Sequence, residues 1–138
     1  FAPMNGLTAL RLSDQSNAVE VAWDSNRMRP GSASPIVHDG RVYVLSNATV
    51  RCGDVETGDL LWSVRLKGRH WATPVIAGGH LYCTNQDGVV RVVKLGDQEG
   101  EIVGETELGE TIHASPAVAG GAMYVRSDKH LWKIAHPQ

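Results

Sequence analysis

Apolar residues gather in short runs that polar or glycine-containing turns separate along most of the chain. The runs RVYVL, LLWSVRL and VVRVVKL are examples, and turns such as HDG, TGD and NQDG stand beside them. Short runs rich in β-branched and aromatic residues predict β-strands, and no segment has the 3.6-residue period of a helix. The pattern therefore predicts an all-β protein.

Three segments of the chain are near-copies of one another. They read SPIVHDGRVYVL (34–45), TPVIAGGHLYCT (73–84) and SPAVAGGAMYVR (115–126). Their prolines lie 39 and 42 residues apart, with a glycine five residues and a tyrosine eight residues after each proline. Repeats of about 40 residues are typical of propeller blades. The aligned positions are Pro35, Pro74 and Pro116, then Gly40, Gly79 and Gly121, then Tyr43, Tyr82 and Tyr124.

Each repeat unit has room for four strands and none for a helix. One strand follows the proline, a hairpin leads to the tyrosine-bearing run, and a third and a fourth strand complete the unit. Residues before Trp23 supply two further strands, so the sheets have two, four, four and three strands. The prediction is a single partial β-propeller over 1–138, with about three and a quarter blades of four antiparallel strands. The blades are the end of a first blade (1–24), two blades (25–66 and 67–108) and an incomplete last blade (109–138).

An open arc of blades leaves apolar faces uncovered, whereas a propeller closes with about four to eight blades. We therefore expect either the C-terminal part of a longer propeller or a half-ring that assembles with copies of itself. In the second case residues 18–24 would supply the missing outer strand of another copy. The start at Phe1 favours the removal of something upstream.

The stretch CGDVETGDLLW (52–62) resembles the tryptophan-docking motif of the PQQ-like, or quinoprotein-like, β-propeller repeat family. Asp54, Thr57, Gly58 and Trp62 match the motif, and Cys52 stands in place of its alanine. The first three residues suit a hydrogen-bonded turn between strands, and the indole suits burial between adjacent blades. The third unit has glycines at the aspartate and tryptophan positions, and the first keeps only its tryptophan. The resemblance covers about residues 18–138.

This family includes quinone-dependent dehydrogenases as well as propellers that bind no cofactor, among them the propeller lipoprotein of outer-membrane protein assembly. The resemblance implies that an enzyme of this family would have a pair of adjacent cysteines over the quinone, a calcium site and an aspartate base. This sequence has no adjacent cysteine pair. The resemblance therefore implies a non-catalytic scaffold, without cofactor, that binds a protein or peptide. The alternatives are a segment of a quinone (PQQ)-dependent dehydrogenase and a purely architectural segment. It also implies a periplasmic or extracellular location.

Composition adds little to this picture. The formal net charge of −2 and the hydrophobic content of 42% fit a globular protein and give no electrostatic reason to expect nucleic acid as a partner. No run approaches the roughly 18 apolar residues of a membrane helix, so we expect no membrane insertion.

The candidate binding residues precede the first strand of each unit, in RMRPGSASP, KGRHWATP and ETIHASP. In a propeller these positions line one mouth of the central channel, and arginine and tryptophan dominate binding hot spots. The alternative is that they are ordinary loop residues, with the tryptophan packed against a neighbour. The predicted channel-rim residues are Arg29, Arg69, His70, Trp71 and His113.

Three catalytic or metal-binding interpretations are weaker. A zinc site from His70, His80 and His113 requires convergent nitrogens, which a hairpin residue and two different units do not supply. Asp39 and Asp87 precede glycine, as tight turns require. Ser34 beside His38 lacks an oxyanion hole, and the Ser or Thr before each proline is interpreted as a strand-entry residue.

Cys52 and Cys83 are the two cysteines of the chain. Neither a disulfide framework nor a CxxC metal or redox site is available. We expect buried thiols, with a disulfide between neighbouring units as the alternative.

Overall fold

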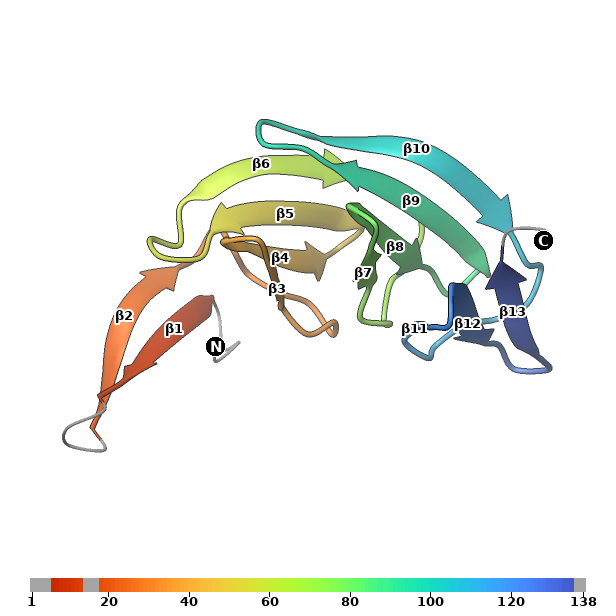
Figure 1. Cartoon of the computed structure of the whole chain (residues 1–138), viewed down its shortest axis with the longest axis horizontal. Coiled ribbons are helices and arrows are strands. Elements are labelled where there is room, and N and C mark those ends of the chain that lie inside the picture. Colours follow the sequence, from red (N-terminus) through yellow and green to blue (C-terminus); the bar gives the residue numbers. More distant parts are fainter. Residues whose placement is uncertain (1–5, 14–17, 136–138) are drawn as a thin grey trace.

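The computed structural model describes residues 6–13 and 18–135, and this part of the chain forms thirteen strands and no helix (Figure 1). The ends of the predicted first and last blades, residues 1–5 and 136–138, lie outside the described residues. The strands are β1 (Leu7–Leu12), β2 (Val19–Ser25), β3 (Ile36–His38), β4 (Arg41–Ser46), β5 (Thr49–Asp54), β6 (Leu60–Arg65), β7 (Val75–Ala77), β8 (His80–Thr84), β9 (Val89–Leu95), β10 (Gly100–Glu107), β11 (Ala117–Ala119), β12 (Ala122–Arg126) and β13 (Leu131–Ala135).

The strands form four antiparallel sheets in sequence order. The first sheet is β1-β2, the second β3-β4-β5-β6, the third β7-β8-β9-β10 and the fourth β11-β12-β13. This is the predicted distribution of two, four, four and three strands. Each of the three repeat prolines directly precedes the first strand of its sheet, where a residue without an N–H is tolerated.

The four sheets follow one another along an arc, as successive propeller blades do (Figure 1). The short strands β3, β7 and β11 lie on its concave side, and β6 and β10 lie on its convex side. The first sheet (β1-β2) and the fourth (β11-β12-β13) lie at opposite ends of the arc. The predicted all-β propeller architecture is confirmed.

The hydrophobic core lies between the sheets, in three separate clusters. One cluster joins the first and second sheets, the next joins the second and third, and the last joins the third and fourth. Each sheet therefore depends on a neighbour to bury its apolar face. The clusters are Leu7, Ala9, Trp23, Met28, Val42 and Val44; then Ala33, Tyr43, Leu45, Val50, Cys52, Trp62, Leu66, Leu81, Cys83 and Val93; then Val90, Ile112, Met123 and Val125.

The first and second sheets each have one buried tryptophan that packs against the sheet that follows. Trp23 Nε1 donates to the Val55 carbonyl at 3.0 Å, and Trp62 Nε1 donates to the Gly96 carbonyl at 3.0 Å. Each indole rests on a glycine of that next sheet, where a Cβ would stand 2.4 Å from Trp23 at Gly58 and 2.6 Å from Trp62 at Gly100. Trp62 thus docks on the turn of the following sheet, while the turn of its own motif receives Trp23.

The turn between β5 and β6 is closed by local hydrogen bonds. Asp54 Oδ1 accepts from the backbone N–H groups of Glu56 (2.8 Å) and Thr57 (3.0 Å). These bonds, the one from Thr57 foremost, hold the pKa of Asp54 below its usual value. Gly58 has φ of 74°, which favours glycine, and its missing side chain leaves room for the Trp23 ring.

The Ser or Thr before each proline links neighbouring sheets. The Ser34 N–H donates to Thr73 Oγ1 at 2.9 Å, and the Thr73 N–H donates to Ser115 Oγ at 3.0 Å. Each hydroxyl therefore accepts from the backbone of the equivalent residue one unit earlier. These residues stand two positions before the first strand of each sheet, as predicted for strand entry, and they also connect neighbouring sheets.

The remaining local predictions concern turns and thiols. Asp39 (φ 47°) and Gly40 (φ 69°) form the tight turn between β3 and β4, and Asp87 lies in the turn between β8 and β9. Both cysteines are free and buried, so the alternative of a disulfide is wrong. Burial raises the pKa of the Cys83 thiol to about 12.

Candidate functional site

An open groove of about 720 Å³ lies where the segment between β6 and β7 crosses the turn between β4 and β5. Residues 65–71 line it together with Asn47 and Ala48, which have φ of 48° and 59°. The Leu66 N–H donates to the Ala48 carbonyl at 2.7 Å, which joins the two segments. The lining residues are Gly31, Ser32, Asn47, Ala48, Arg65, Leu66, Lys67, Gly68, Arg69, His70 and Trp71.

The segment 67–71 is held by hydrogen bonds from the third sheet. Asn85 is buried and donates through Nδ2 to the Lys67 carbonyl at 3.3 Å, while the Gln86 N–H donates to the Arg69 carbonyl at 2.8 Å. Gly68 has φ of 84°, and a Cβ there would stand 2.2 Å from Asn85 Nδ2. Close packing and glycine conformation therefore fix this segment in one position.

A buried arginine supports the same segment. Arg91 on β9 is 5% exposed, and its Nη1 donates to the Lys67 carbonyl at 2.7 Å. Its Nε donates to Glu105 Oε2 on β10 at 2.7 Å, in an ion pair. Burial of a guanidinium is costly unless it is paired and hydrogen-bonded, and this one is both.

The structure brings three of the five predicted rim residues to the groove and a fourth beside it. Arg69, His70 and Trp71 line the groove. The Trp71 indole is 57% exposed and contacts His113 of the next linker edge to face, with ring centroids 6.4 Å apart. The predicted packing of Trp71 against a neighbour thus coexists with an exposed indole. Arg29 is exposed in the segment between β2 and β3 and does not line the groove.

His70 differs from the exposed cation that its loop position suggested. Its two ring nitrogens are buried and have no hydrogen-bond partner in the described part of the chain. Burial lowers its pKa, and the nearby Arg91 charge lowers it further, whereas the Gly68 backbone and the Asp87 carboxylate oppose this. The lowered pKa favours the neutral form of His70, which lines the groove.

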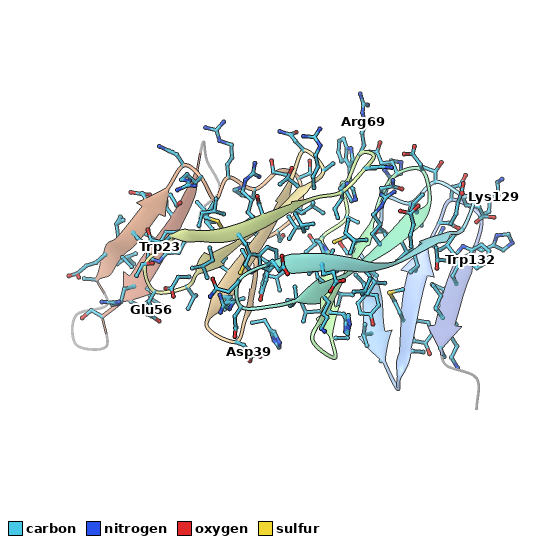
Figure 2. All side chains as sticks on the ribbon, turned by 90° about the horizontal axis from the view of Figure 1, so that it is seen from above. Trp23, Asp39, Glu56, Arg69, Lys129 and Trp132 are labelled. Atoms are coloured by element: carbon cyan, nitrogen blue, oxygen red, sulfur yellow. The ribbon has the colours of Figure 1, made fainter. Side chains whose placement is uncertain are left out.

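Two linkers between sheets are basic while the opposite face of the arc is acidic, and the net charge of −2 conceals this. We call the linker face the one formed by the segments that join successive sheets, and the hairpin face the opposite one. Figure 2 shows Arg69 on the linker face and Asp39 and Glu56 on the hairpin face. Linker segments 26–35 and 66–74 have arginine or lysine and no carboxylate, whereas the third linker, 108–116, has Glu110 and neither arginine nor lysine. The described turns of the hairpin face at 39–40, 54–59, 78–79, 96–99 and 120–121 have no arginine or lysine; their carboxylates are Asp39, Asp54, Glu56, Asp59, Asp97 and Glu99.

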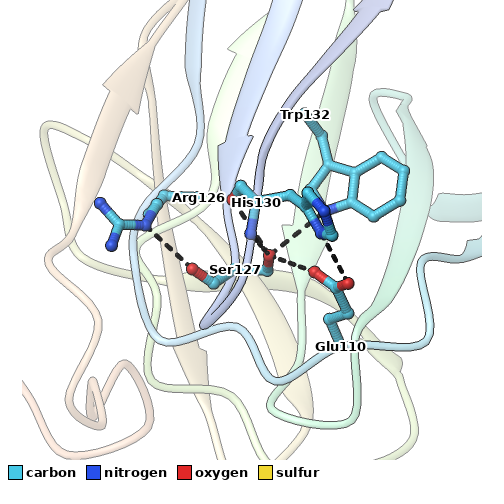
Figure 3. A network of polar contacts seen from close by, with 5 residues as sticks. All are labelled: Glu110, Arg126, Ser127, His130 and Trp132. Carbon is cyan, nitrogen blue, oxygen red and sulfur yellow. Dashed lines mark hydrogen bonds and ion pairs between the residues drawn. The ribbon is translucent and has the colours of Figure 1, made fainter.

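A polar network that sequence inspection missed closes the linker face at the fourth sheet (Figure 3). Glu110 accepts from Ser127 Oγ at 2.5 Å and from His130 Nδ1 at 2.7 Å. Trp132 Nε1 and the His130 N–H donate to the same Ser127 hydroxyl, at 3.3 and 2.9 Å. The bonds to Glu110, the one from Ser127 foremost, hold its pKa below its usual value. Glu110 lies in the loop before β11, Ser127 and His130 lie between β12 and β13, and Trp132 lies on β13, so their spacing in the sequence gave no signal.

Within residues 6–13 and 18–135, no three His, Cys, Asp or Glu side chains gather as metal ligands would. The same part of the chain contains no helix long and apolar enough to cross a membrane.

Comparison with protein families identifies the repeat. The family model described as outer membrane protein assembly factor BamB matches residues 15–97, a stretch that includes the whole groove. The chain belongs to this BamB family.

A curated relative supports the assignment. The outer membrane protein assembly factor BamB of Legionella pneumophila (strain Paris) is 30% identical over 95 residues, which is 68% of this chain and 24% of the relative. The chain thus spans about a quarter of the length of that BamB.

Solved structures share the fold. BamB from Moraxella catarrhalis superposes with a TM-score of 0.60 and 18% identity, over 86% of this chain and 40% of that one. A europium-containing methanol dehydrogenase has a TM-score of 0.54 at 18% identity, over 66% of this chain and 19% of that one. The quinohemoprotein alcohol dehydrogenase ADHIIG from Pseudomonas putida HK5 has a TM-score of 0.54 at 20% identity, over 67% of this chain and 16% of that one. At these identities the likeness concerns the fold alone.

Proposed function

We propose that this chain is part of a non-catalytic BamB-family propeller that binds protein or peptide partners through its linker face. The carrying observation is the exposed Trp71 indole beside the groove, on a segment held by the buried Arg91 and Asn85. A rigid aromatic anchor next to a concave surface is the kind of site on which protein partners dock.

The names of the relatives suggest where such a partner belongs. Two of the similar proteins are named BamB, and the one from Legionella pneumophila is described as an outer membrane protein assembly factor. We propose that the partner is a protein of outer-membrane assembly and that the location is periplasmic or otherwise extracytoplasmic. No cofactor is needed for this role.

Photocrosslinking in cells tests the proposal. A photoreactive amino acid at position 71 of the full protein is expected to give discrete crosslinks to an outer-membrane assembly protein. The matched control carries the same amino acid at position 39, on the hairpin face. Equal crosslinking from both positions, or none from position 71, would refute a role for the linker face.

We further propose that more blades of the same protein cover the two ends of the arc. The first sheet leaves Leu10, Val19 and Val21 exposed, and the fourth leaves Val118 and Leu131 exposed, the last at 69%. Exposed apolar faces of this kind associate with a partner surface. Light scattering on this 138-residue chain separates the alternatives. Aggregation or a monomer supports missing blades, whereas a discrete dimer supports a self-assembled half-ring.

The dehydrogenase alternative rests on fold likeness alone. Addition of the quinone and calcium to the full protein, followed by dye reduction, tests it directly. Dye reduction with an alcohol or sugar substrate would overturn the non-catalytic proposal.

A further inference from the structure

The groove carries three cations that are not neutralised. Arg65, Lys67 and Arg69 are all exposed and all line it. Among residues 6–13 and 18–135, none of the three forms an ion pair with a carboxylate. No aspartate or glutamate lines the groove either. Three like charges on neighbouring positions repel one another, and an anionic ligand would relieve this repulsion.

The backbone of Lys67 and Arg69 is held by the third sheet. The carbonyls of Lys67 and Arg69 accept hydrogen bonds from Arg91, Asn85 and the Gln86 backbone. The buried Arg91 guanidinium is itself paired with Glu105, so it supports the segment without adding a free charge to the groove. A binding site gains from such preorganisation because less conformational entropy is lost when the ligand arrives.

The groove offers both electrostatic and apolar contacts to a ligand. The Trp71 indole lines it beside the cations. Arginine pairs with carboxylates through two parallel hydrogen bonds, and an exposed indole packs against an apolar or aromatic side chain. Carboxylates interspersed with an apolar residue would satisfy both kinds of contact.

We propose that this groove binds an acidic peptide segment of the partner, with its carboxylates on Arg65, Lys67 and Arg69 and an apolar side chain on Trp71. The inference rests on the proposed function and adds the chemistry of the ligand. A peptide fits better than nucleic acid, because the hairpin face is acidic and the whole chain has a pI of about 6.3. A long polyanion would be repelled from such a molecule outside the groove.

Fluorescence anisotropy on the purified full protein tests the ligand class. The first probe is a labelled peptide of about ten residues with alternate glutamates and one central leucine. The others are the same peptide with glutamine in place of glutamate and a single-stranded oligonucleotide of similar length. Binding is measured at about 0.05 and 0.15 M salt to detect electrostatic screening. The glutamate peptide is expected to bind at least about tenfold more tightly than the glutamine peptide and to weaken as salt rises.

Two charge-reversal variants of equal net charge locate the site. Arg65→Glu/Arg69→Glu is expected to weaken the glutamate peptide at least about tenfold, whereas Lys94→Glu/Lys133→Glu, on exposed positions outside the groove, is expected to change it less than about twofold. Lys67→Ala/Arg69→Ala gives the same comparison with a smaller perturbation of folding. Near-ultraviolet circular dichroism and thermal melting establish that each variant is folded.

Each outcome of these measurements bears on the proposal. Equal loss in both reversal variants, equal affinity for the two peptides, or tighter binding of the oligonucleotide would overturn it. Crosslinking from position 71 together with no glutamate-peptide binding would overturn the acidic ligand and leave the proposed function standing. Absence of both would overturn the two together.

Discussion

The backbone N–H of Ser34 donates a 2.9 Å hydrogen bond to Oγ1 of Thr73, the residue at the equivalent position of the next repeat unit. Thr73 repeats the relationship with Ser115, at 3.0 Å. These hydroxyls thus link the second sheet to the third and the third to the fourth, just before the first strand of each sheet.

Replacement of Thr73 with valine removes this hydroxyl and preserves the shape of the side chain. The free energy of unfolding is expected to fall by about 0.5 to 1.5 kcal/mol, the usual net value of one hydrogen bond. Urea denaturation measures it. Thr73→Ser keeps the hydroxyl and is expected to retain most of the stability, so an equal loss in both variants would contradict the assignment.

Trp62→Ala removes an indole that is buried between the second and third sheets and hydrogen-bonded to Gly96. A loss of about 3 to 5 kcal/mol is expected, as for other buried aromatic residues. Trp71→Ala is the matched control, because its indole is 57% exposed. Thermal melting compares the two variants, and similar melting temperatures would argue against docking by Trp62.

Gly100 and Gly104 lie on the same strand and are expected to respond differently to alanine. A Cβ at Gly100 would stand 2.6 Å from the Trp62 ring, whereas one at Gly104 meets Val92 at an ordinary 3.5 Å. Gly100→Ala is expected to cost about 1 to 3 kcal/mol through overpacking. Gly104→Ala is expected to be neutral or to stabilise by up to about 1 kcal/mol, since it restricts the unfolded chain. Denaturation midpoints that fall equally would refute the close approach of Trp62.

Arg91→Met is expected to loosen the segment 67–71 without removing a groove charge. The variant loses the bonds from the guanidinium to the Lys67 carbonyl and to Glu105. Hydrogen exchange at the Gln86 amide, which donates to the Arg69 carbonyl, is expected to accelerate by about tenfold or more as local opening becomes easier. Glu105→Gln leaves the bond to Lys67 and is expected to have a smaller effect. Unchanged Gln86 exchange in Arg91→Met would show that Arg91 does not support the segment.

The stability of the fourth sheet is expected to depend on acid pH through Glu110. Its pKa is lowered in the folded protein by the bonds from Ser127 and His130. The stabilisation is therefore fully present above the ordinary glutamate pKa of about 4.3 and is lost as the pH falls through the lower folded value. The difference in melting temperature between the wild type and Glu110→Gln is expected to shrink over this range. A constant difference would contradict this role.

Most of the fold could be predicted from the spacing of the repeats. Proline, glycine and tyrosine recur at fixed offsets, and from them the strands and their distribution over four sheets follow. The residues that Trp62 contacts could not be predicted from the sequence. The other motif residues belong to the same sheet as Trp62, whereas its indole packs on the next sheet. Local spacing describes a turn and says little about which turn faces which side chain.

The candidate site was predictable only in part. Arg69, His70 and Trp71 share a segment, so their common place on the groove follows from the loop itself. The burial of His70 and the support from Arg91 depend on the third sheet, and the segregation of charge depends on which turns share a face. A net charge of −2 averages over both faces and hides the basic groove.

The clusters of buried residues lie between sheets, so no single sheet contains a core of its own. The smallest cooperative unit is then a pair of neighbours, and each added repeat extends the molecule by one more interface of the same kind. A piece that keeps two neighbouring sheets keeps one buried cluster and is expected to fold, whereas a single sheet keeps none; every cut between sheets also exposes the two apolar faces that met there. The same rule lets such a protein lengthen or shorten by whole repeats during evolution without a redesign of its interior.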